Sequence, residues 1–488
     1  MRVDRMTIVA WDGSGPVLVW TRLRMKIVSG LVLLRKWLDQ GEFRVKPLIV
    51  IFAATFFLLV ILIAIPGYFS HDELVWLDEI RLGNYWVLTH EPFFRPLGAV
   101  VLSAVLRFPL QPFAAHVSSV FLQSLNCCLL YWLVNKFWPD RAIVAALLFA
   151  LMPGTAFAVG WVGALFDLLF VFFSLVSLGA AISFWRGGHW GLVFLTCMAF
   201  AAGLLCKEVA VTLPLAAAVI AGCDRTRAEP RRLAVLSSGA VAVILIYALL
   251  WLPTLLRIGT GSVGGPEWLG DYAFGSISTI TTNALALFGF PFTIRTTEII
   301  GYEDQSLGLI LESTVPHLLL VFLMWCRYGR AASFLYLTAY FLPLLPVLII
   351  SKHETQYIYA SSIAISVALA LVWAPRLVYA VPTIALVVIL ALHGLRIQRY
   401  MYITGGCQTR TLLTTAAVLP FVKASSPLIV YGAANTPAAA VRALHDRTFY
   451  VDDREMRVVL SRRAEGASLN VSKDCDVTLI AHSENNPH

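Results

Sequence analysis

The amino-acid sequence predicts an all-α polytopic membrane protein, with about eleven transmembrane helices and a small C-terminal α/β domain. Hydrophobic residues make up 59% of the 488 residues and charged residues 14%, whereas soluble domains carry about 25% charged residues. Apolar runs long enough to cross a bilayer, about 20 residues each, recur between residues 47 and 395. Residues 396–488 instead alternate short apolar and polar stretches, as a small α/β unit does.

The chain begins with a basic segment, residues 1–46, which is expected to stay in the cytoplasm because Lys and Arg accumulate on that side of a membrane. The first apolar run, 47–69, carries the first span at 48–67. It is too long, and too far into the chain, for a cleavable signal peptide, so it is expected to act as an anchor. The net charge of +8 has the same membrane explanation, and it predicts no binding of nucleic acid.

Lys and Arg beside the later apolar runs orient the other spans. The transmembrane domain is expected to cover 47–395, and the domain at 396–488 is expected outside the cytoplasm. Residues 255–307 are expected to form an external or re-entrant loop. A full crossing at 276–293 is the alternative, but it would place the basic stretch 326–330 outside. The remaining spans are expected at 113–135, 142–159, 163–184, 190–205, 209–222, 233–254, 308–326, 331–350, 356–374 and 378–395.

Four polar stretches interrupt the apolar pattern, and this topology places all of them on the extracytoplasmic side. Their positions played no part in orienting the helices, whereas purely structural charges should occur on both sides. Their clustering therefore favours an active site or a substrate path at the membrane surface. The four stretches are His-Asp-Glu at 71–73, Phe-Arg-Pro-Leu at 94–97, Cys-Lys-Glu at 206–208 and Ser-Lys-His-Glu at 351–354.

The acidic residues Asp72 and Glu73 lie in the expected external loop 68–112, directly after the first span. A partly desolvated carboxylate in such a place can act as a general base. A hydrated surface position is the simpler interpretation of the same pattern. His90 and Glu91, later in the loop, are possible supporting groups.

Two cations are candidates for binding a phosphate. Arg95 precedes a proline and is expected in an extended or turn conformation. It could hold a phosphate through two hydrogen bonds, or it could simply reach lipid headgroups. Lys207 and Glu208 interrupt an apolar run, where charges are costly and are usually paired or functional. Lys207 suits a phosphate as a point charge, and a structural ion pair at a helix break explains the motif equally well.

Lys352 and His353, between two expected spans, are further charged candidates for binding a phosphate. Possible supporting residues elsewhere are Asp167, a lone acid near the outer end of its span, and the pair Glu354 and Gln356. No zinc-binding spacing, phosphate-binding loop or serine-hydrolase motif occurs in the sequence. No metal site and no cofactor are therefore predicted.

Cys407 and Cys475 could form a disulfide outside the membrane, although the sequence alone does not establish the pairing.

The order of the motifs resembles the membrane core of the C-type (GT-C) integral-membrane glycosyltransferases. The similarity is greatest to transmembrane and tetratricopeptide-repeat O-mannosyltransferases and their bacterial relatives, without the repeats. It extends over residues 48–222 and, more weakly, over 330–374. It rests on the acidic pair after the first span and then, in order, on FRPL, HVSSVFLQSLNCCLLYWLV, ALLFALMPGTAFAVGWVGALFDLLF, LLCKEVAVTLP and IYASS.

This resemblance implies an inverting glycosyltransferase that moves a sugar from a polyprenyl-phosphate carrier to an acceptor on the non-cytoplasmic face. It matches the acidic pair of the family to Asp72 and Glu73, one of which would deprotonate the acceptor hydroxyl, with Asp72 as the first choice. It matches the Lys-Glu motif to Lys207 and Glu208. Cations such as Arg95 and Lys207 would then stabilise the leaving phosphate.

The expected partners are membrane lipid, a polyprenyl-phosphate-linked sugar and an acceptor that is an envelope glycan, a glycolipid or a protein. A bacterial inner membrane is the expected location. Two alternatives stay open: a transporter or flippase, since intramembrane charges also mark substrate paths, and a polymerase or ligase of lipid-linked glycans. Transporters tend to contain internal repeats with interrupted helices, which this sequence does not show.

Overall fold

The structure, a computed structural model, confirms a predominantly helical, polytopic membrane protein. The chain divides into two units, Met1–Ile49 and Val50–His488, and the second contains the helix bundle and the C-terminal sheet. The structure describes residues 45–69, 94–108, 110–224, 229–259, 276–297, 306–350, 354–418, 428–431, 448–451, 454–461, 468–472 and 474–480.

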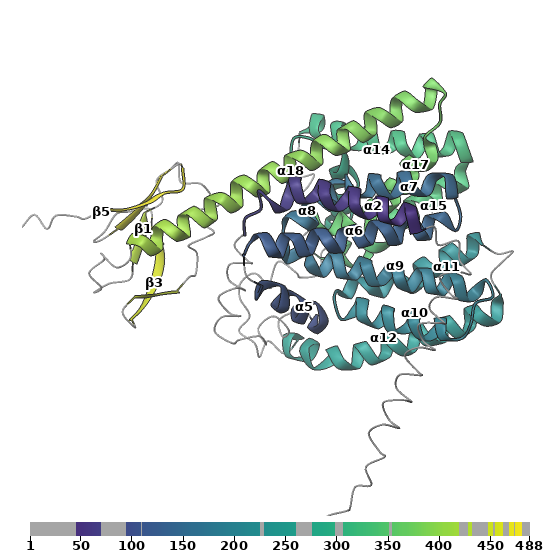
Figure 1. The fold of residues 1–488 in the computed structure, drawn as a ribbon, viewed down its shortest axis with the longest axis horizontal. Helices are drawn as coiled ribbons and strands as arrows, with labels where there is room; N and C mark the ends of the chain where they lie inside the picture. Colours follow the sequence, from purple (N-terminus) through teal and green to yellow (C-terminus); the bar gives the residue numbers. More distant parts are fainter. Residues whose placement is uncertain are drawn as a thin grey trace, which may run out of the picture. The chain divides into compact units, whose positions relative to one another are not determined.

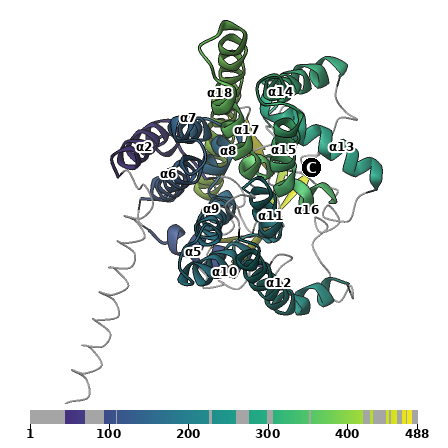
Figure 2. The same ribbon diagram turned by 90° about the vertical axis from the view of Figure 1, so that its right-hand side faces the viewer.

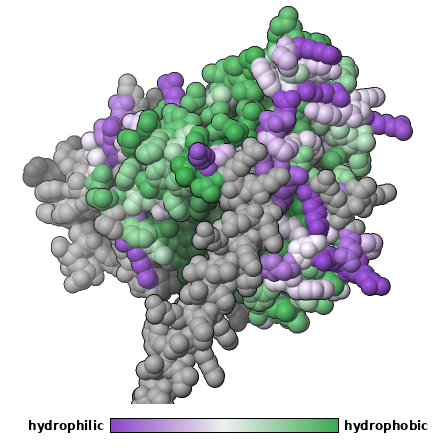
Figure 3. Space-filling view, turned by 45° about the vertical axis from the view of Figure 1, so that its right-hand side comes forward, coloured by the Kyte–Doolittle hydropathy of each residue, from purple (hydrophilic) through white to green (hydrophobic). Residues whose placement is uncertain are grey.

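Within these ranges, eight helices are long and apolar enough to cross a membrane. A ninth results if α7 and α8, which meet at a bend of 52°, count as one span. The apolar runs expected as spans at 190–205 and 209–222 form shorter helices, as does the run 276–293 in the expected external or re-entrant loop. The count of eleven therefore stays a prediction. Figure 3 shows the broad apolar surface that such helices present, with hydrophilic side chains gathered toward one side.

Most helices of the second unit run side by side (Figure 1). In the first half of the chain they are α2 (Val45–Leu59, continued by a π-turn, Val60–Ala64), α5 (Pro96–Leu106), α6 (Phe113–Asn135), α7 (Pro139–Ala150), α8 (Pro153–Gly160), α9 (Leu165–Trp185), α10 (Gly191–Leu204), α11 (Leu213–Cys223) and α12 (Pro230–Gly259). They are followed by α13 (Ile277–Gly289), α14 (Leu307–Tyr328), α15 (Arg330–Phe341), α16 (Leu345–Leu348), α17 (Ile358–Val372) and α18 (Leu377–Val418).

Helix α9 is the centre of the bundle. Within its apolar window 78% of the residues are buried, against 6% in α12. Figure 2, which looks along many of the helices, shows α9 among α5, α6, α10 and α11. Gly179 permits close packing on α6, because a Cβ there would lie 1.7 Å from the ring of Trp132. An all-round apolar helix suits the interior of a bundle as well as a lipid environment, and the first turn of α9 carries Asp167.

The chain after α10 breaks its helix before it forms α11. Lys207 adopts an extended conformation (φ −158°, ψ 131°) and precedes a short 3-10 helix, Glu208–Thr212. The carbonyl oxygen of Leu205, at the end of α10, accepts hydrogen bonds from the amides of Leu97 (3.1 Å) and Gly98 (3.4 Å) at the start of α5. The FRPL and CKE stretches, far apart in the sequence, therefore meet at the same place.

Helix α18 begins at Leu377, close to the predicted position, but continues to Val418, past residue 395 where the span is expected to end. The extra turns are polar, and their glycines let them pack closely: a Cβ at Gly405 would lie 2.9 Å from the Cβ of Tyr68. The expected domain boundary at 395 thus falls inside a continuous helix.

The C-terminal region contains a five-stranded sheet in the order β2-β3-β1-β4-β5. The central strand β1 pairs in parallel with β3 and β4, whereas β2 and β5 pair antiparallel at the two edges. The strands are β1 (Leu428–Tyr431), β2 (Thr448–Val451), β3 (Arg454–Ser461), β4 (Ser468–Val471) and β5 (Val477–Ile480).

A disulfide links this region to α18. Cys407 on the helix is bonded to Cys475 between β4 and β5, with Cα atoms 5.3 Å apart. Thr411 donates to the carbonyl oxygen of Cys475 (3.2 Å), and the amide of Val477 donates to Thr414 (3.0 Å). The pairing that the sequence left open is therefore present in the structure.

Candidate functional site

Two ion pairs lie where α5, α9 and the break after α10 meet. The first joins Arg95, directly before α5, to Glu208, with Nε–Oε2 at 2.8 Å and Nη2–Oε1 at 2.6 Å. Two parallel hydrogen bonds of this kind fix both the position and the plane of a guanidinium group. The Arg95 and Glu208 side chains remain 17% and 23% exposed, so a ligand can still reach this pair.

The second pair is almost completely buried. Lys207 Nζ lies 2.6 Å from Asp167 Oδ1, and the side chains are 3% and 9% exposed. The ammonium group also lies 5.0 Å from the centre of the Tyr357 ring, a distance at which a cation is attracted by the ring face. Because Lys207 is extended and Asp167 is in the first turn of α9, the pair joins the helix break to the most buried helix of the bundle.

Together Arg95, Asp167, Lys207 and Glu208 form what we call the charge cluster. Burial acts to lower the pKa of Arg95, but the carboxylate of Glu208 raises it by more, so the guanidinium stays charged. Burial acts to raise the pKa of Glu208, but Arg95 and then Lys207 lower it below its ordinary value. The cluster has two positive and two negative members and is neutral overall, which reduces the cost of holding charges away from water.

A layer of polar side chains lies next to the cluster inside the bundle. Asn126 of α6 donates to the Tyr359 hydroxyl (2.9 Å) and to the carbonyl oxygen of Leu168 on α9 (3.0 Å). The Tyr359 hydroxyl also donates to Gln123. These contacts tie α6, α9 and α17 together, and they hold the start of α17, with Tyr357 just before it, against Lys207.

The residues on the two sides of the stretch 70–93, which contains the acidic residues 71–73 and lies outside the described residues, are firmly held. Before it, the carbonyl oxygen of Tyr68 lies 3.2 Å from Nε2 of the buried His116, and Phe69 is 5% exposed. After it, the carbonyl oxygen of Phe94 accepts from the Tyr247 hydroxyl (3.3 Å), and Arg95 belongs to the charge cluster. The chain therefore enters and leaves this stretch at defined positions.

Half of the predicted site residues lie outside the described residues, and their roles stay predictions: Asp72, Glu73, His90, Glu91, Lys352 and His353. Among the others, Arg95, Lys207, Glu208 and Asp167 come together in the charge cluster. Glu354 accepts a hydrogen bond from Gln356, one residue before Tyr357. In the part of the chain that the structure describes, no group of three or more His, Cys, Asp or Glu residues could hold a metal ion.

Sequence reasoning missed three features of the site. It paired Lys207 with Glu208, its neighbour, whereas the structure pairs Lys207 with Asp167 and Glu208 with Arg95. It treated Tyr357 as an interfacial aromatic, and it did not single out Tyr247. The signal for the first was available, since a lone acid in an apolar span needs a partner.

Cations of a different kind lie at the opposite helix ends, and we call Lys136, Arg186, Arg232 and Arg327 the basic end. Arg186 follows α9, whose first turn carries Asp167. Arg327 donates to the carbonyl oxygens of Val372 and Trp373 at the end of α17, whose start adjoins the charge cluster. The two groups of charges therefore mark the two ends of the helices that they share.

Comparison with known proteins gives loose structural likenesses. No sequence-family description matches the chain, and no curated protein matches it. ArnT from Cupriavidus metallidurans is similar in two crystal structures. The form bound to undecaprenyl phosphate has a TM-score of 0.44 at 15% identity, and the apo form 0.44 at 13%; each covers 78% of this chain and 82% of that chain. The arabinofuranosyltransferase AftD from Mycobacteria has a TM-score of 0.31 at 15% identity, over 80% of this chain and 29% of that chain. At TM-scores below 0.5 these likenesses assign neither a family nor an activity to this chain.

Proposed function

We propose that the protein is a GT-C-type membrane glycosyltransferase that transfers a sugar from a polyprenyl-phosphate carrier to an acceptor hydroxyl at the extracytoplasmic surface. The observation that carries the proposal is the charge cluster. It holds a partly exposed arginine and a buried lysine, and the chain that leads into this arginine contains the acidic stretch 71–73. The order of the sequence motifs supplies the reaction class.

The reaction needs a base and a stabilised leaving group. A carboxylate takes the proton from the acceptor hydroxyl while its oxygen attacks the anomeric carbon. The bond from that carbon to the phosphate oxygen breaks with inversion, and the electron pair leaves on the polyprenyl phosphate. Cations placed at this oxygen lower the barrier, because they act where negative charge develops.

Arg95 is the residue that we assign to the phosphate. It is more exposed than Lys207, and a phosphate presents the same geometry to a guanidinium as a carboxylate does. A bound phosphate would therefore take the place of one or both oxygens of Glu208 on Arg95. Lys207 stays paired with Asp167 and adds positive charge to the site from its buried position.

Asp72 or Glu73 would supply the base. Both residues lie within the stretch whose two flanks are held next to Tyr68 and to the charge cluster. Asp167 and Glu208 are less suited to the role, because each already accepts hydrogen bonds from a cation. In Glu208 the neighbouring cation lowers the pKa of the carboxyl and so its affinity for another proton, and Asp167 is almost completely buried.

The disulfide and the basic end both favour an extracytoplasmic site. Disulfides persist in oxidising compartments, and Cys407 is on the part of α18 that packs on Tyr68 and Phe69. Lys and Arg accumulate on the cytoplasmic side, and the basic end is opposite. A bacterial inner membrane with the site facing the periplasm fits both observations.

The experiment that tests the proposal is transfer of a labelled sugar. Purified protein is incubated with radiolabelled polyprenyl-phosphate sugars and a membrane extract of its own host, beside the variants Asp72→Asn, Glu73→Gln and Arg95→Gln. Arg232→Gln, at the basic end, is the matched control.

We expect label in a new product with the wild type and with Arg232→Gln. Arg95→Gln and at least one acid variant should lose at least about 100-fold in rate, the scale on which general bases and charge-stabilising groups act. Full transfer in Asp72→Asn, Glu73→Gln and the double variant would refute the base assignment. Movement of intact donor across vesicle membranes without transfer would instead indicate a flippase.

A further inference from the structure

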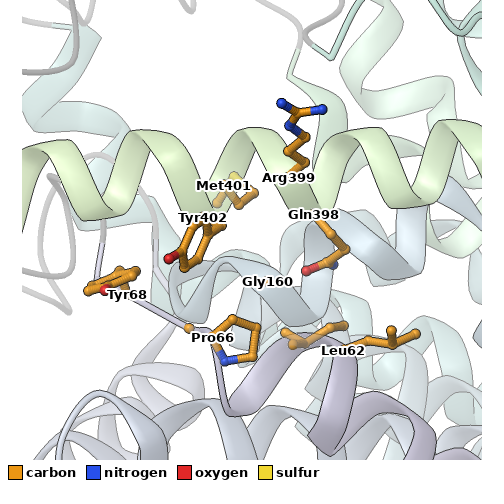
Figure 4. A pocket seen from close by; sticks show the side chains of 10 residues that line it. Leu62, Pro66, Tyr68, Gly160, Gln398, Arg399, Met401 and Tyr402 are labelled. Atoms are coloured by element: carbon orange, nitrogen blue, oxygen red, sulfur yellow. The ribbon is translucent and has the colours of Figure 1, made fainter. Parts of the chain in front are cut away.

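A cavity of about 230 Å³ lies between the end of the first span and α18, apart from the charge cluster. Its walls come from Pro66 and Tyr68 on one side and from Gln398 and Tyr402 of α18 on the other. Figure 4 shows the two tyrosine rings facing each other and Gln398 directed toward Gly160. The first span ends at Ala64, so the cavity lies at the edge of the membrane.

The walls of this cavity are fixed by close packing at glycines. A Cβ at Gly67 would lie 2.3 Å from the His116 ring, and one at Gly405 would lie 2.9 Å from the Cβ of Tyr68. A Cβ at Gly160 would lie 3.2 Å from Gln398 Nε2. The first span, α8 and α18 therefore approach each other as closely as their backbones allow, and the cavity keeps its shape.

The cavity offers aromatic faces and hydrogen-bonding groups together. The rings of Tyr68 and Tyr402 are centred 5.4 Å apart at an angle of 55°, and the residues are 37% and 48% exposed. Among the described residues neither hydroxyl has a hydrogen-bond partner. Gln398 donates through Nε2 to the carbonyl oxygen of Ala156, which leaves its Oε1 available to a ligand.

We propose that this cavity binds one uncharged sugar ring of the acceptor, a proposal that rests on the proposed function. A sugar has C–H faces that pack on the electron-rich faces of aromatic rings and hydroxyls that pair with Tyr68, Tyr402 and Gln398. Among the described residues that line the cavity none is acidic, and in Figure 4 the Arg399 guanidinium extends away from Gly160 and Pro66. The volume of about 230 Å³ suits a single ring.

The position of the cavity connects it to the chemistry. Tyr68 precedes Asp72 by four residues, so their Cα atoms lie within about 14 Å, the limit of a fully extended chain. A sugar ring bound at Tyr68 can therefore extend its next unit to the expected base. Tyr68 and Tyr402 are positioning residues in this view, since they touch the acceptor at a distance from the reacting atoms.

Direct binding tests the cavity independently of transfer. Saturation-transfer NMR is recorded on the purified full chain in detergent with four probes: the methyl glycosides of glucose, mannose, galactose and N-acetylglucosamine. The variants are Tyr402→Ala, Tyr402→Phe and, as the matched control on α18, Ile403→Ala, whose side chain is 55% exposed. Elution as a single species in size-exclusion chromatography confirms that each variant is folded; Tyr68→Leu replaces Tyr402→Ala if the latter fails.

We expect saturation of at least one glycoside with the wild type, at least a threefold loss in Tyr402→Ala, a smaller loss in Tyr402→Phe and no change in Ile403→Ala. The absence of signal with all four probes, or an equal signal in Tyr402→Ala, would overturn the assignment. So would a co-purified phospholipid whose amount falls in Tyr402→Ala. Because no donor is present, binding without any transfer activity would refute the proposed function and leave the cavity assignment intact.

Discussion

The basic end and the charge cluster hold their cations in different ways, although Arg186 and Arg232 at the basic end also pair with Asp224 and Glu229. At the basic end Arg232 Nη1 donates to the carbonyl oxygens of Phe184 (2.8 Å) and Gly188 (2.6 Å), and Arg327 Nη1 donates to those of Val372 (2.6 Å) and Trp373 (2.7 Å). These are carbonyls at or near the ends of α9 and α17. In the charge cluster, Arg95 and Lys207 instead bond to carboxylates.

The difference separates a structural use of cations from a functional one. Helix C-termini leave carbonyl groups without partners, and a cation there satisfies them and complements the helix dipole. Arg186 of the basic end also has a buried partner, Asp224, but it donates in addition to the carbonyl oxygen of Lys136 at the end of α6. The carboxylate bonds of Arg95 and Lys207 satisfy no helix end, and removing two charges from water costs about as much as their attraction returns. We therefore regard the basic end as part of the membrane topology and the charge cluster as part of the site.

The largest expected effect is on cysteine labelling, which reports whether the basic end faces the cytoplasm and the charge cluster the outside. Cys223 and Cys326 are exposed near the basic end, and Cys407 is bonded to Cys475. A membrane-impermeant maleimide should label Cys223 and Cys326 in inverted vesicles and not in intact cells. It should label Cys407 and Cys475 only after reduction, and from the outside.

The variants Cys223→Ser and Cys326→Ser identify the labelled positions by mass spectrometry. Labelling of Cys223 in intact cells would reverse the assignment of the two ends and place the charge cluster in the cytoplasm.

The second prediction tests whether the Lys207–Asp167 pair contributes to transfer activity or only to stability. Lys207→Met leaves the Asp167 carboxylate buried without its partner, which should lower the free energy of unfolding by about 3–5 kcal/mol. The double variant Lys207→Met/Asp167→Leu removes both charges and should recover most of this stability without recovering transfer. Denaturant unfolding in detergent and the transfer assay measure the two quantities.

The buried pair Arg186–Asp224 at the basic end, with side chains 18% and 8% exposed, is the control for this experiment. Its double variant, Arg186→Met/Asp224→Leu, should retain transfer. Equal activity in both double variants would show that the charge cluster is no more functional than the basic end.

A third, smaller effect is expected from a carbonyl-bonded arginine. Arg327→Gln removes two hydrogen bonds from a charged group to Val372 and Trp373. Each such bond contributes about 1.5–3 kcal/mol at most, and water at the helix end replaces much of it. We expect the free energy of unfolding to fall by about 1–2 kcal/mol and transfer activity to stay unchanged. A loss of transfer as large as that of Arg95→Gln would show that the basic end is as important for activity as the charge cluster.

The sequence predicts the membrane class and the positions of the long spans because apolar run length is a local property. The pairing of Lys207 with Asp167 is not local, since it depends on how α9 and α10 lie against each other. Adjacency in the sequence therefore favoured Glu208 as the partner of Lys207.

The end of α18 is a second case in which a local pattern was insufficient. Apolar character fades after residue 395, so hydropathy ends the span there, yet Gln408 and Thr411 continue the helix as buried polar residues. Their burial arises from the C-terminal region, whose Cys475 is bonded to Cys407 of α18. Tertiary contacts thus extend an element beyond the point where the membrane alone would end it.

The smallest effect is the pH dependence of the Arg95–Glu208 pair. Arg95 lowers the pKa of Glu208 below its ordinary value of 4.5. A carboxylate with a lowered pKa contributes stability that is complete above its unfolded pKa and is lost as the pH falls through the folded one. At neutral pH Glu208→Gln should therefore be less stable than the wild type by about 1 kcal/mol, because the pair is partly exposed to water.

This difference in the free energy of unfolding should disappear as the pH falls below 4.5 and through the lowered pKa of Glu208. Denaturant unfolding at a series of pH values measures it. Glu229→Gln is the matched control, since Glu229 also pairs with an arginine but is 51% exposed at the basic end, and it should change stability by no more than a few tenths of a kcal/mol. A gap in Glu208→Gln that stays constant into strong acid would mean that Arg95 does not depend on the charge of Glu208. The guanidinium would then be held by other contacts, and exchange of Glu208 for a phosphate would no longer be the way in which the donor binds.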